Sequence, residues 1–286
     1  MTAIALRIDV SHLAGAERAV PAALSLLQEL ECSGSFFFSL GADRSGLAWR
    51  DSWLRRRELG RAALAYGRFW PAPVLARRCS GVIRQVRDLG FECGVMPPSS
   101  VDWLRLLQGA YIPESDFEAE ILQVIDAYRQ IFGEAPALFA APGNRMNRMA
   151  YRLLQRHGFY CVSATEGSGP FWPVANAELA QCLAMPVSLP AFDLLRESAQ
   201  LRDSLLQQSA GWQENDYALL MLRAESLLCP GALDVLRGLL QAWLAQGHSL
   251  VGVRALAESW PITQVHYHSV AWAQGAAGDQ QGPLFP

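Results

Sequence analysis

Short apolar runs alternate along this chain with longer stretches in which apolar residues recur at helical spacing. The short runs predict buried strands over residues 4–10, 33–40, 90–96, 137–141, 159–164, 216–223 and 249–253. The longer stretches predict helices over residues 16–30, 81–89, 116–131, 145–157 and 232–246. Strands that alternate with helices in this way imply right-handed crossovers. We therefore expect an α/β fold with a mostly parallel sheet or barrel.

Local signals predict where some elements begin and end. Ser115 and Glu118 form a candidate capping box at the start of the helix over 116–131, and Gly133 closes that helix. Residues 97–100 are expected to form a loop that two prolines stiffen. The last residues show no periodicity. We therefore predict one domain over residues 1–262 and a flexible C-terminal tail over residues 263–286.

Composition narrows the possible functions. The net charge is only −3, which argues against general nucleic-acid binding. No apolar run is long enough to span a bilayer, and the N-terminus has no signal-peptide pattern, so a cytoplasmic location is expected. The six cysteines show no CxxC pairing, which favours buried thiols over disulfides or a zinc site. There is also no P-loop, dinucleotide-binding or GxSxG motif.

Polar residues at predicted strand ends are the candidates for chemistry. Asp9 ends the first strand and could act as a metal ligand, a general base or a helix cap. His12 lies three residues later, where an ordinary loop histidine is the favoured interpretation. Arg223 and Glu225 follow a late strand and could enter the same cleft as Asp9, or could form a surface ion pair of little energetic value. Arg145, after a Pro-Gly turn, could bind a phosphate or carboxylate.

The stretch from Trp53 to Trp70 combines arginines with aromatic residues. It could lie at a membrane interface, with arginines at anionic headgroups and aromatic rings at the boundary. Alternatively, it could be a solvated helix with one aromatic side in the core. The residues themselves favour neither alternative.

Taken together, these segments resemble the polysaccharide deacetylase (NodB-like) family. The similarity is strongest to the branch that deformylates undecaprenyl-phosphate-linked formamido-arabinose during lipid A modification. It covers residues 4–259, and its anchors are residues 6–10, 37–41, 65–67, 92–94, 141–145 and 186–190. The resemblance implies a distorted (β/α) barrel with mostly parallel strands. It also implies an amide hydrolase that uses a divalent metal such as zinc.

The family pattern assigns a role to each matching position. The general-base Asp corresponds to Asp9, which is retained. The metal-binding Asp corresponds to Ser11, and the two metal-binding His correspond to Met96 and Ser100. The late catalytic His corresponds to Arg223, which cannot act as a general acid near neutral pH. Because hydroxyl and thioether groups are poor zinc ligands, the resemblance implies loss of the metal site, and no cofactor is expected.

Three hypotheses follow. In the first, the chain is an inactive homologue whose cleft binds a sugar-phosphate lipid, a glycan or a partner protein, with possible peripheral contact to the inner membrane. In the second, it is an active hydrolase of an amide on a lipid-linked amino sugar. Its rebuilt site would then use some of Asp9, His12, Cys93 and Glu225, although strand alternation turns Cys93 away from Met96. In the third, it is a structural or regulatory subunit with a vestigial cleft.

Overall fold

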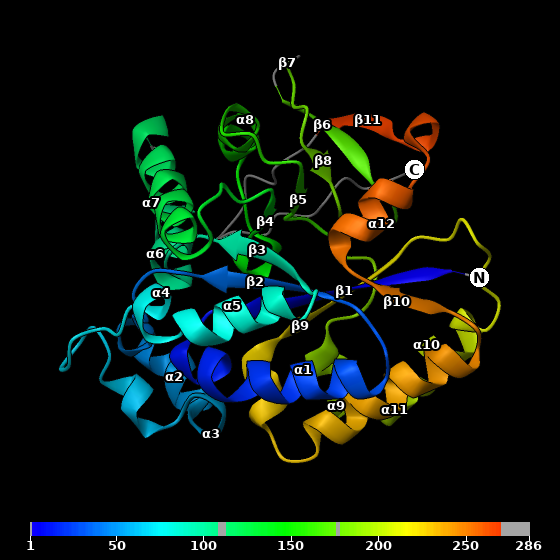
Figure 1. The fold of residues 1–286 in the computed structure, drawn as a ribbon, viewed down its shortest axis with the longest axis horizontal. Coiled ribbons are helices and arrows are strands. Elements are labelled where there is room, and N and C mark those ends of the chain that lie inside the picture. Colours follow the sequence, from blue (N-terminus) through cyan, green and yellow to red (C-terminus); the bar gives the residue numbers. More distant parts are fainter. Residues whose placement is uncertain (1, 108–112, 176–177, 270–286) are drawn as a thin grey trace.

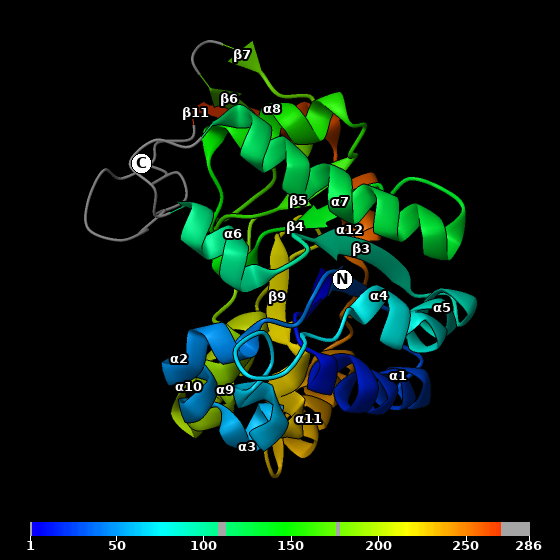
Figure 2. The ribbon, with the colours of Figure 1, turned by 90° about the vertical axis from the view of Figure 1, so that its left-hand side faces the viewer.

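A curled, mostly parallel sheet organises the protein. The computed structural model describes residues 2–107, 113–175 and 178–269. The sheet has the strand order β10-β1-β2-β3-β4-β5-β8-β6-β11, with β9 paired to β1 and β7 to β6. It curls into a half-barrel with helices on its outside (Figures 1 and 2). The strands are β1 (Ala3–Val10), β2 (Ser35–Ser39), β3 (Glu92–Met96), β4 (Leu138–Ala140), β5 (Cys161–Ser163), β6 (Phe171–Ala175), β7 (Glu178–Leu179), β8 (Leu183–Ala184), β9 (Ala218–Arg223), β10 (Ser249–Val251) and β11 (His266–Ser269).

The helices connect successive parallel strands. The longer ones are α1 (Val20–Glu29), α5 (Ser80–Asp88), α6 (Ser100–Leu107), α7 (Glu114–Phe132), α8 (Arg148–Arg156), α10 (Ala199–Ser209) and α11 (Ala232–Ala245). The short ones are α2 (Trp49–Leu54), α3 (Arg56–Leu59), α4 (Leu75–Arg78), α9 (Phe192–Glu197) and α12 (Val253–Ser259). Single turns of 3-10 or π type are η1 (Gly15–Ala19), η2 (Ser45–Ala48), η3 (Arg61–Leu64), η4 (Pro142–Asn144), η5 (Ala224–Leu228) and η6 (Ile262–Gln264). The predicted α/β barrel class is confirmed.

Alternation along the strands divides the core into two layers. Phe36 and Phe38 on β2 pack into the outer cluster, between the sheet and the helices. Phe37 packs into the inner cluster, where Met96 also lies. Because both faces of the strand are buried, its three central residues are all apolar. This is why short apolar runs located the central strands from the sequence.

The start of α7 differs from the prediction. The helix begins at Glu114, and Pro113 occupies the N-cap position, so Ser115 lies within the first turn. The Ser115 hydroxyl donates to Asp116 Oδ1 instead of capping a backbone amide. The predicted capping box is therefore wrong, because a proline fixed in an extended conformation sets the first turn two residues earlier. Gly133 closes the helix in the left-handed conformation, as predicted.

The predicted C-terminal tail starts too early. Residues 266–269 form β11, which pairs in parallel with β6 from His266 opposite Phe171 to Ser269 opposite Val174. Backbone hydrogen bonds hold this strand, and they leave no apolar pattern in the sequence. The remainder of the predicted tail, residues 270–286, lies outside the described residues. The predicted loop over 97–100 is also shorter, because α6 begins at Ser100.

Candidate functional site

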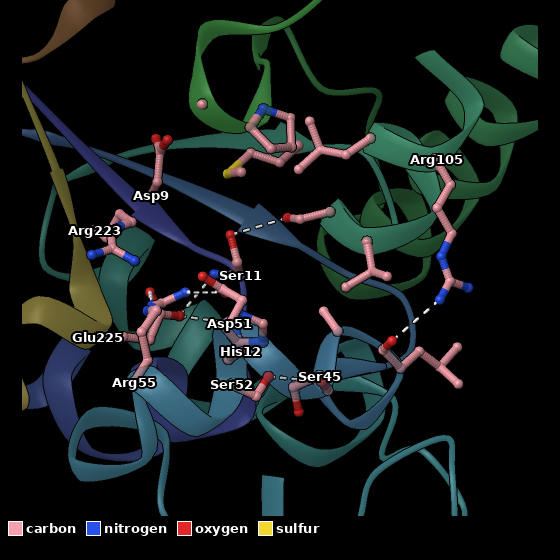
Figure 3. A pocket seen from close by; sticks show the side chains of 18 of the residues that line it. Asp9, Ser11, His12, Ser45, Asp51, Ser52, Arg55, Arg105, Arg223 and Glu225 are labelled. Carbon is pink, nitrogen blue, oxygen red and sulfur yellow. Dashed lines mark hydrogen bonds and ion pairs between the residues drawn. The ribbon is translucent and has the colours of Figure 1, made fainter. Parts of the chain in front are cut away.

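A cavity of about 410 Å³ opens where β1, β3 and β9 end. The strand ends and the segment around α2 contribute most of its polar side chains (Figure 3). An apolar side is formed by Leu47 and Ala48 of η2 together with Leu104 of α6. The residues that line the cavity are Asp9, Ser11, His12, Ser45, Leu47, Ala48, Asp51, Ser52, Arg55, Met96, Ser100, Val101, Leu104, Arg105, Pro142, Gly143, Met221, Arg223 and Glu225. The structure therefore brings most of the predicted site residues to one place.

Asp9 is neutralised by a buried arginine on its own strand. Arg7 Nε donates to Asp9 Oδ1 over 2.8 Å and Arg7 Nη2 to Asp9 Oδ2 over 2.7 Å. Arg7 is fully buried, and its other N–H groups donate to Asn144 Oδ1 and to the backbone oxygens of Ser163 and Ala141. Burial raises the pKa of Asp9, and the Arg7 charge opposes that rise. The carboxylate is thus held in a bidentate ion pair with both oxygens occupied.

Glu225 is fixed at the floor of the cavity by backbone groups. It is fully buried, and its Oε1 accepts hydrogen bonds from the amides of Ser11 at 3.0 Å and His12 at 2.8 Å. Gly15 makes room for this carboxylate, because a Cβ there would lie 2.5 Å from Glu225 Oε1. Glu225 Oε2 lies 3.9 Å from Arg55 Nη2, and neither atom has a hydrogen-bond partner among the described residues.

Arg223 belongs to a second ion pair at the cavity wall. Its Nε and Nη2 donate to Asp193 Oδ2 over 3.0 and 2.9 Å. Burial alone would lower the pKa of Arg223, but the Asp193 carboxylate raises it. Arg223 therefore stays cationic and already has a carboxylate partner.

His12 is held by a carboxylate that the sequence analysis did not single out. His12 Nδ1 lies 3.2 Å from Asp43 Oδ1, and Asp43 Oδ2 accepts from the Leu13 amide over 2.9 Å. Burial works to raise the pKa of Asp43, but its hydrogen bonds and the neighbouring His12 lower it overall. The contact orients the imidazole, and His12 Nε2 has no hydrogen-bond partner among the described residues.

Ser11, Met96 and Ser100 meet on the wall beside Asp9. Ser100 Oγ donates to Ser11 Oγ over 3.2 Å, and Met96 lines the same cavity. These side chains offer two hydroxyls and a thioether, whereas zinc in proteins prefers imidazole, thiolate and carboxylate ligands. In the described ranges, no group of three or more His, Cys, Asp or Glu could hold a metal ion. The donor set does not fit a zinc ion.

Two predicted site residues lie elsewhere. Arg145 is partly buried, does not line the cavity, and its backbone oxygen accepts from Trp103 Nε1 over 2.9 Å. The left-handed Gly143 and Asn144 turn redirects the chain between the cavity and Arg145. Cys93 packs against the outer cluster while Met96 lies in the inner one. Burial raises the pKa of Cys93 to about 12, so a thiolate is not available there near neutral pH.

The arginine-rich and aromatic stretch from Trp53 to Trp70 exposes three of its rings. Trp53 is 53% exposed, Phe69 73% and Trp70 57%. Arg56 stacks on Trp53 and Arg68 on Phe69, each with its Cζ 4.9 Å from the ring centroid. The alternative that one aromatic side of this stretch packs in the core is wrong for these three rings, but it holds for Tyr66, which is partly buried against the outer cluster. Within the described residues, no helix has the length and apolar character needed to cross a bilayer.

A comparison with curated proteins finds a relative over most of the chain. A probable 4-deoxy-4-formamido-L-arabinose-phosphoundecaprenol deformylase, ArnD, of Shewanella sediminis is 28% identical over 206 residues. The match covers 68% of this chain and 66% of the relative, a little under two thirds of its length. Over this match the chain is similar to a deformylase of the NodB-like deacetylase type. No family model matches the sequence.

Solved structures share the fold of this chain. A polysaccharide deacetylase structure from Mycobacterium smegmatis has a TM-score of 0.68 at 18% identity and covers 96% of this chain and 95% of its own. A carbohydrate esterase family 4 pseudoenzyme from Bacillus anthracis, BA3943, has a TM-score of 0.52 at 11% identity, with 93% and 69% covered. A mutant of that pseudoenzyme with restored enzymatic activity has the same TM-score at 10% identity, with 91% and 69% covered.

Sequence reasoning missed several residues that shape the cavity. Arg7 had one available signal, because a charged residue inside an otherwise apolar strand needs a buried partner. Asp43, Arg55 and Asp193 gave no comparable signal. They lie on loops or helix ends, and their partners are distant in sequence.

Proposed function

We propose that this deacetylase homologue is a binding protein that has lost metal-dependent amide hydrolysis. The observation that carries the proposal is the set of side chains at Ser11, Met96 and Ser100, which meet in one cavity but offer no good zinc ligand. Arg223, in the position of the catalytic acid, is engaged with Asp193. The loss of metal binding is inferred from the two hydroxyls and the thioether at these positions, and not from the fold.

The ligand that we propose is a sugar linked to a lipid phosphate, or a related glycan. The relative from Shewanella sediminis is named for a phosphoundecaprenol-linked sugar, which supports this class. The cavity combines a polar floor with an apolar side formed by Leu47, Ala48 and Leu104. Arg105 on α6 lines the cavity, donates through Nη2 to the backbone oxygen of Leu47 over 3.3 Å, and has no carboxylate partner among the described residues. We assign the phosphate contact to Arg105 in place of Arg145.

We also propose that the segment over residues 44–78 contacts an anionic membrane surface. It contains nine arginines and two acidic residues, and it carries the exposed Trp53, Phe69 and Trp70. Leu47 and Ala48 of the same segment line the cavity directly before the exposed Trp49. A lipid-linked ligand could then enter from the bilayer side.

A rebuilt hydrolase is the second candidate function. The observation that favours it is the His12–Asp43 pair, in which Asp43 fixes the orientation of an imidazole at the cavity wall. Such a pair is the usual arrangement of a histidine general base. A purely structural role has no specific observation in its favour.

The hydrolysis assay separates the two candidates. Purified wild-type protein is incubated with N-formyl and N-acetyl amino sugars, with and without added zinc, and release of formate or acetate is measured. The proposal predicts no release above the buffer rate under either condition. Zinc-dependent release would contradict it, and metal-independent release that is lost in His12→Gln and Asp43→Asn would establish the rebuilt site.

Vesicle co-sedimentation tests the membrane contact. The wild type should sediment with vesicles that contain phosphatidylglycerol and much less with pure phosphatidylcholine vesicles. Trp53→Ser combined with Phe69→Ser should reduce the sedimenting fraction several-fold, because interfacial binding scales with apolar area. Ile262→Ser is the matched control, since Ile262 is 75% exposed but lies outside the segment. Equal sedimentation of all three proteins would reject this surface.

A further inference from the structure

Two buried polar atoms at the cavity floor have no hydrogen-bond partner among the described residues. They are Glu225 Oε2 and Arg55 Nη2, which lie 3.9 Å apart, too far for a hydrogen bond. Buried groups of this kind are normally paired, because leaving a charged atom unpaired is costly. Both residues line the cavity, and Figure 3 shows their side chains next to each other at its floor.

The two residues differ in how firmly they are held. Glu225 is fully buried and fixed through Oε1 by the backbone amides of Ser11 and His12. Arg55 lies at the C-terminal end of the six-residue helix α2, and its Nε donates to Glu58 Oε2 over 2.9 Å. Arg55 Nη1 also lies 3.7 Å from Asp51 Oδ2, and the Nη2 end of the side chain makes no hydrogen bond among the described residues. A group that enters the cavity can therefore reach Glu225 Oε2 by displacing the end of the Arg55 side chain.

We propose that Arg55 and Glu225 form a recognition site for a hydroxyl group of a neutral, carbohydrate-like ring. A hydroxyl can donate its proton to Glu225 Oε2 and accept a hydrogen bond from Arg55 Nη2 at the same time. A carboxylate or phosphate group offers only acceptors and is repelled by Glu225. An ammonium group offers only donors and is repelled by Arg55.

The remaining charges of the inner cavity support an uncharged ring. Asp9 is occupied by Arg7, and Arg223 is occupied by Asp193. A charged ligand group at the floor would therefore find each of these counter-charges already paired. This inference rests on the proposed binding function and adds to it the part of the ligand that the floor recognises.

Sugar binding to the full chain tests the inference. Neutral pyranoses (D-glucose, D-galactose, D-mannose, D-xylose and L-arabinose) are titrated by saturation-transfer NMR, with D-glucuronate and D-glucosamine as charged counterparts. At least one neutral sugar should bind, and the charged counterparts should bind more weakly than D-glucose. If no neutral sugar binds up to its solubility limit, or if the charged sugars bind best, the inference is overturned.

Two variants test whether Arg55 and Glu225 are responsible for the binding of the neutral sugar. Glu225→Gln keeps an oxygen for the Ser11 and His12 amides but turns an N–H donor toward Arg55. Arg55→Met keeps the bulk of the side chain and removes the donor. Each should weaken the binding of the neutral sugar by about tenfold or more. Arg254→Met is the matched control, because Arg254 forms an exposed pair with Glu258 and does not line the cavity.

The outcomes distinguish this inference from the proposed function. Equal binding by wild type, Glu225→Gln and Arg55→Met would overturn the hydroxyl site and leave a binding cavity in place. Zinc-dependent amide hydrolysis by the wild type would overturn the proposed function, while the comparison of the variants would still decide the role of Arg55 and Glu225. Circular dichroism of each variant checks that a loss of binding is not a loss of fold.

Discussion

Buried ion pairs determine which charged side chains around the cavity are available for chemistry. Asp9 would be a candidate general base if it were accessible and weakly paired, but both of its oxygens accept from Arg7. Arg7 in turn joins β1 to the ends of β4 and β5 through Ala141 and Ser163. The Arg7–Asp9 pair therefore stabilises the fold, although the family resemblance places Asp9 at the position of a general base.

Removing one partner of that pair should destabilise the protein strongly. We predict that Arg7→Met lowers the free energy of unfolding by about 3–5 kcal/mol, because Asp9 is left buried without its counter-charge. Adding Asp9→Leu to that variant should recover part of the loss. Urea denaturation measures both values. A double variant no more stable than Arg7→Met would contradict this account.

Asp43 should contribute to stability in a pH-dependent way. Its pKa in the folded protein lies below its ordinary value of 3.8. The stabilisation is therefore fully present above that pH and is lost as the pH falls through the lower, folded pKa. We predict that acidification below about pH 4 destabilises the wild type more than Asp43→Asn. Urea midpoints across that range test this, and parallel pH profiles for the two proteins would be inconsistent with it.

At the scale of the element, the turn after β1 is shaped to fit Glu225. Gly15 begins η1, and a Cβ there would collide with the fixed carboxylate. We predict that Gly15→Ala lowers the free energy of unfolding by about 1–3 kcal/mol. Gly238→Ala is the control, because Gly238 lies in the interior of α11 with nothing within 4 Å of the added methyl.

The control should change stability in the opposite direction. Gly238→Ala should raise the free energy of unfolding by about 0.5–1 kcal/mol, since alanine favours a helix interior. Thermal or urea unfolding of both variants supplies the comparison. A Gly15→Ala variant as stable as the wild type would contradict the close packing of η1 against the Glu225 carboxylate.

The elements that the sequence predicted are those whose core contacts leave a local pattern. The three central residues of β2 are all apolar because both faces of that strand are buried, and α11 has a regular apolar stripe. Among the described residues, four strands were missed: β7 and β8 have two residues each, and β6 and β11 pair with each other far apart in sequence. Such pairing depends on a partner distant in sequence, which no local pattern reveals.

At the scale of the whole molecule, the parallel sheet gathers the strand ends into one cavity. This is why Asp9, Arg223 and Glu225, far apart in sequence, could be expected together, and why the structure places them in one lining. Asp193 and Arg55, the partners of Arg223 and Glu225, could not be expected, because they lie at helix ends distant in sequence. Arg7, the partner of Asp9, lies on the same strand. Arg145 was assigned to the cleft, but the turn at Gly143 carries it away.

A zinc titration of two proteins tests the central claim most directly. One is the wild type, and the other carries Ser11→Asp, Met96→His and Ser100→His, which places the family's ligands on the same scaffold. Isothermal titration calorimetry should show no stoichiometric zinc binding to the wild type and about one zinc per chain for the triple variant. Stoichiometric zinc binding by the wild type, lost on exchange into chelator, would contradict the account.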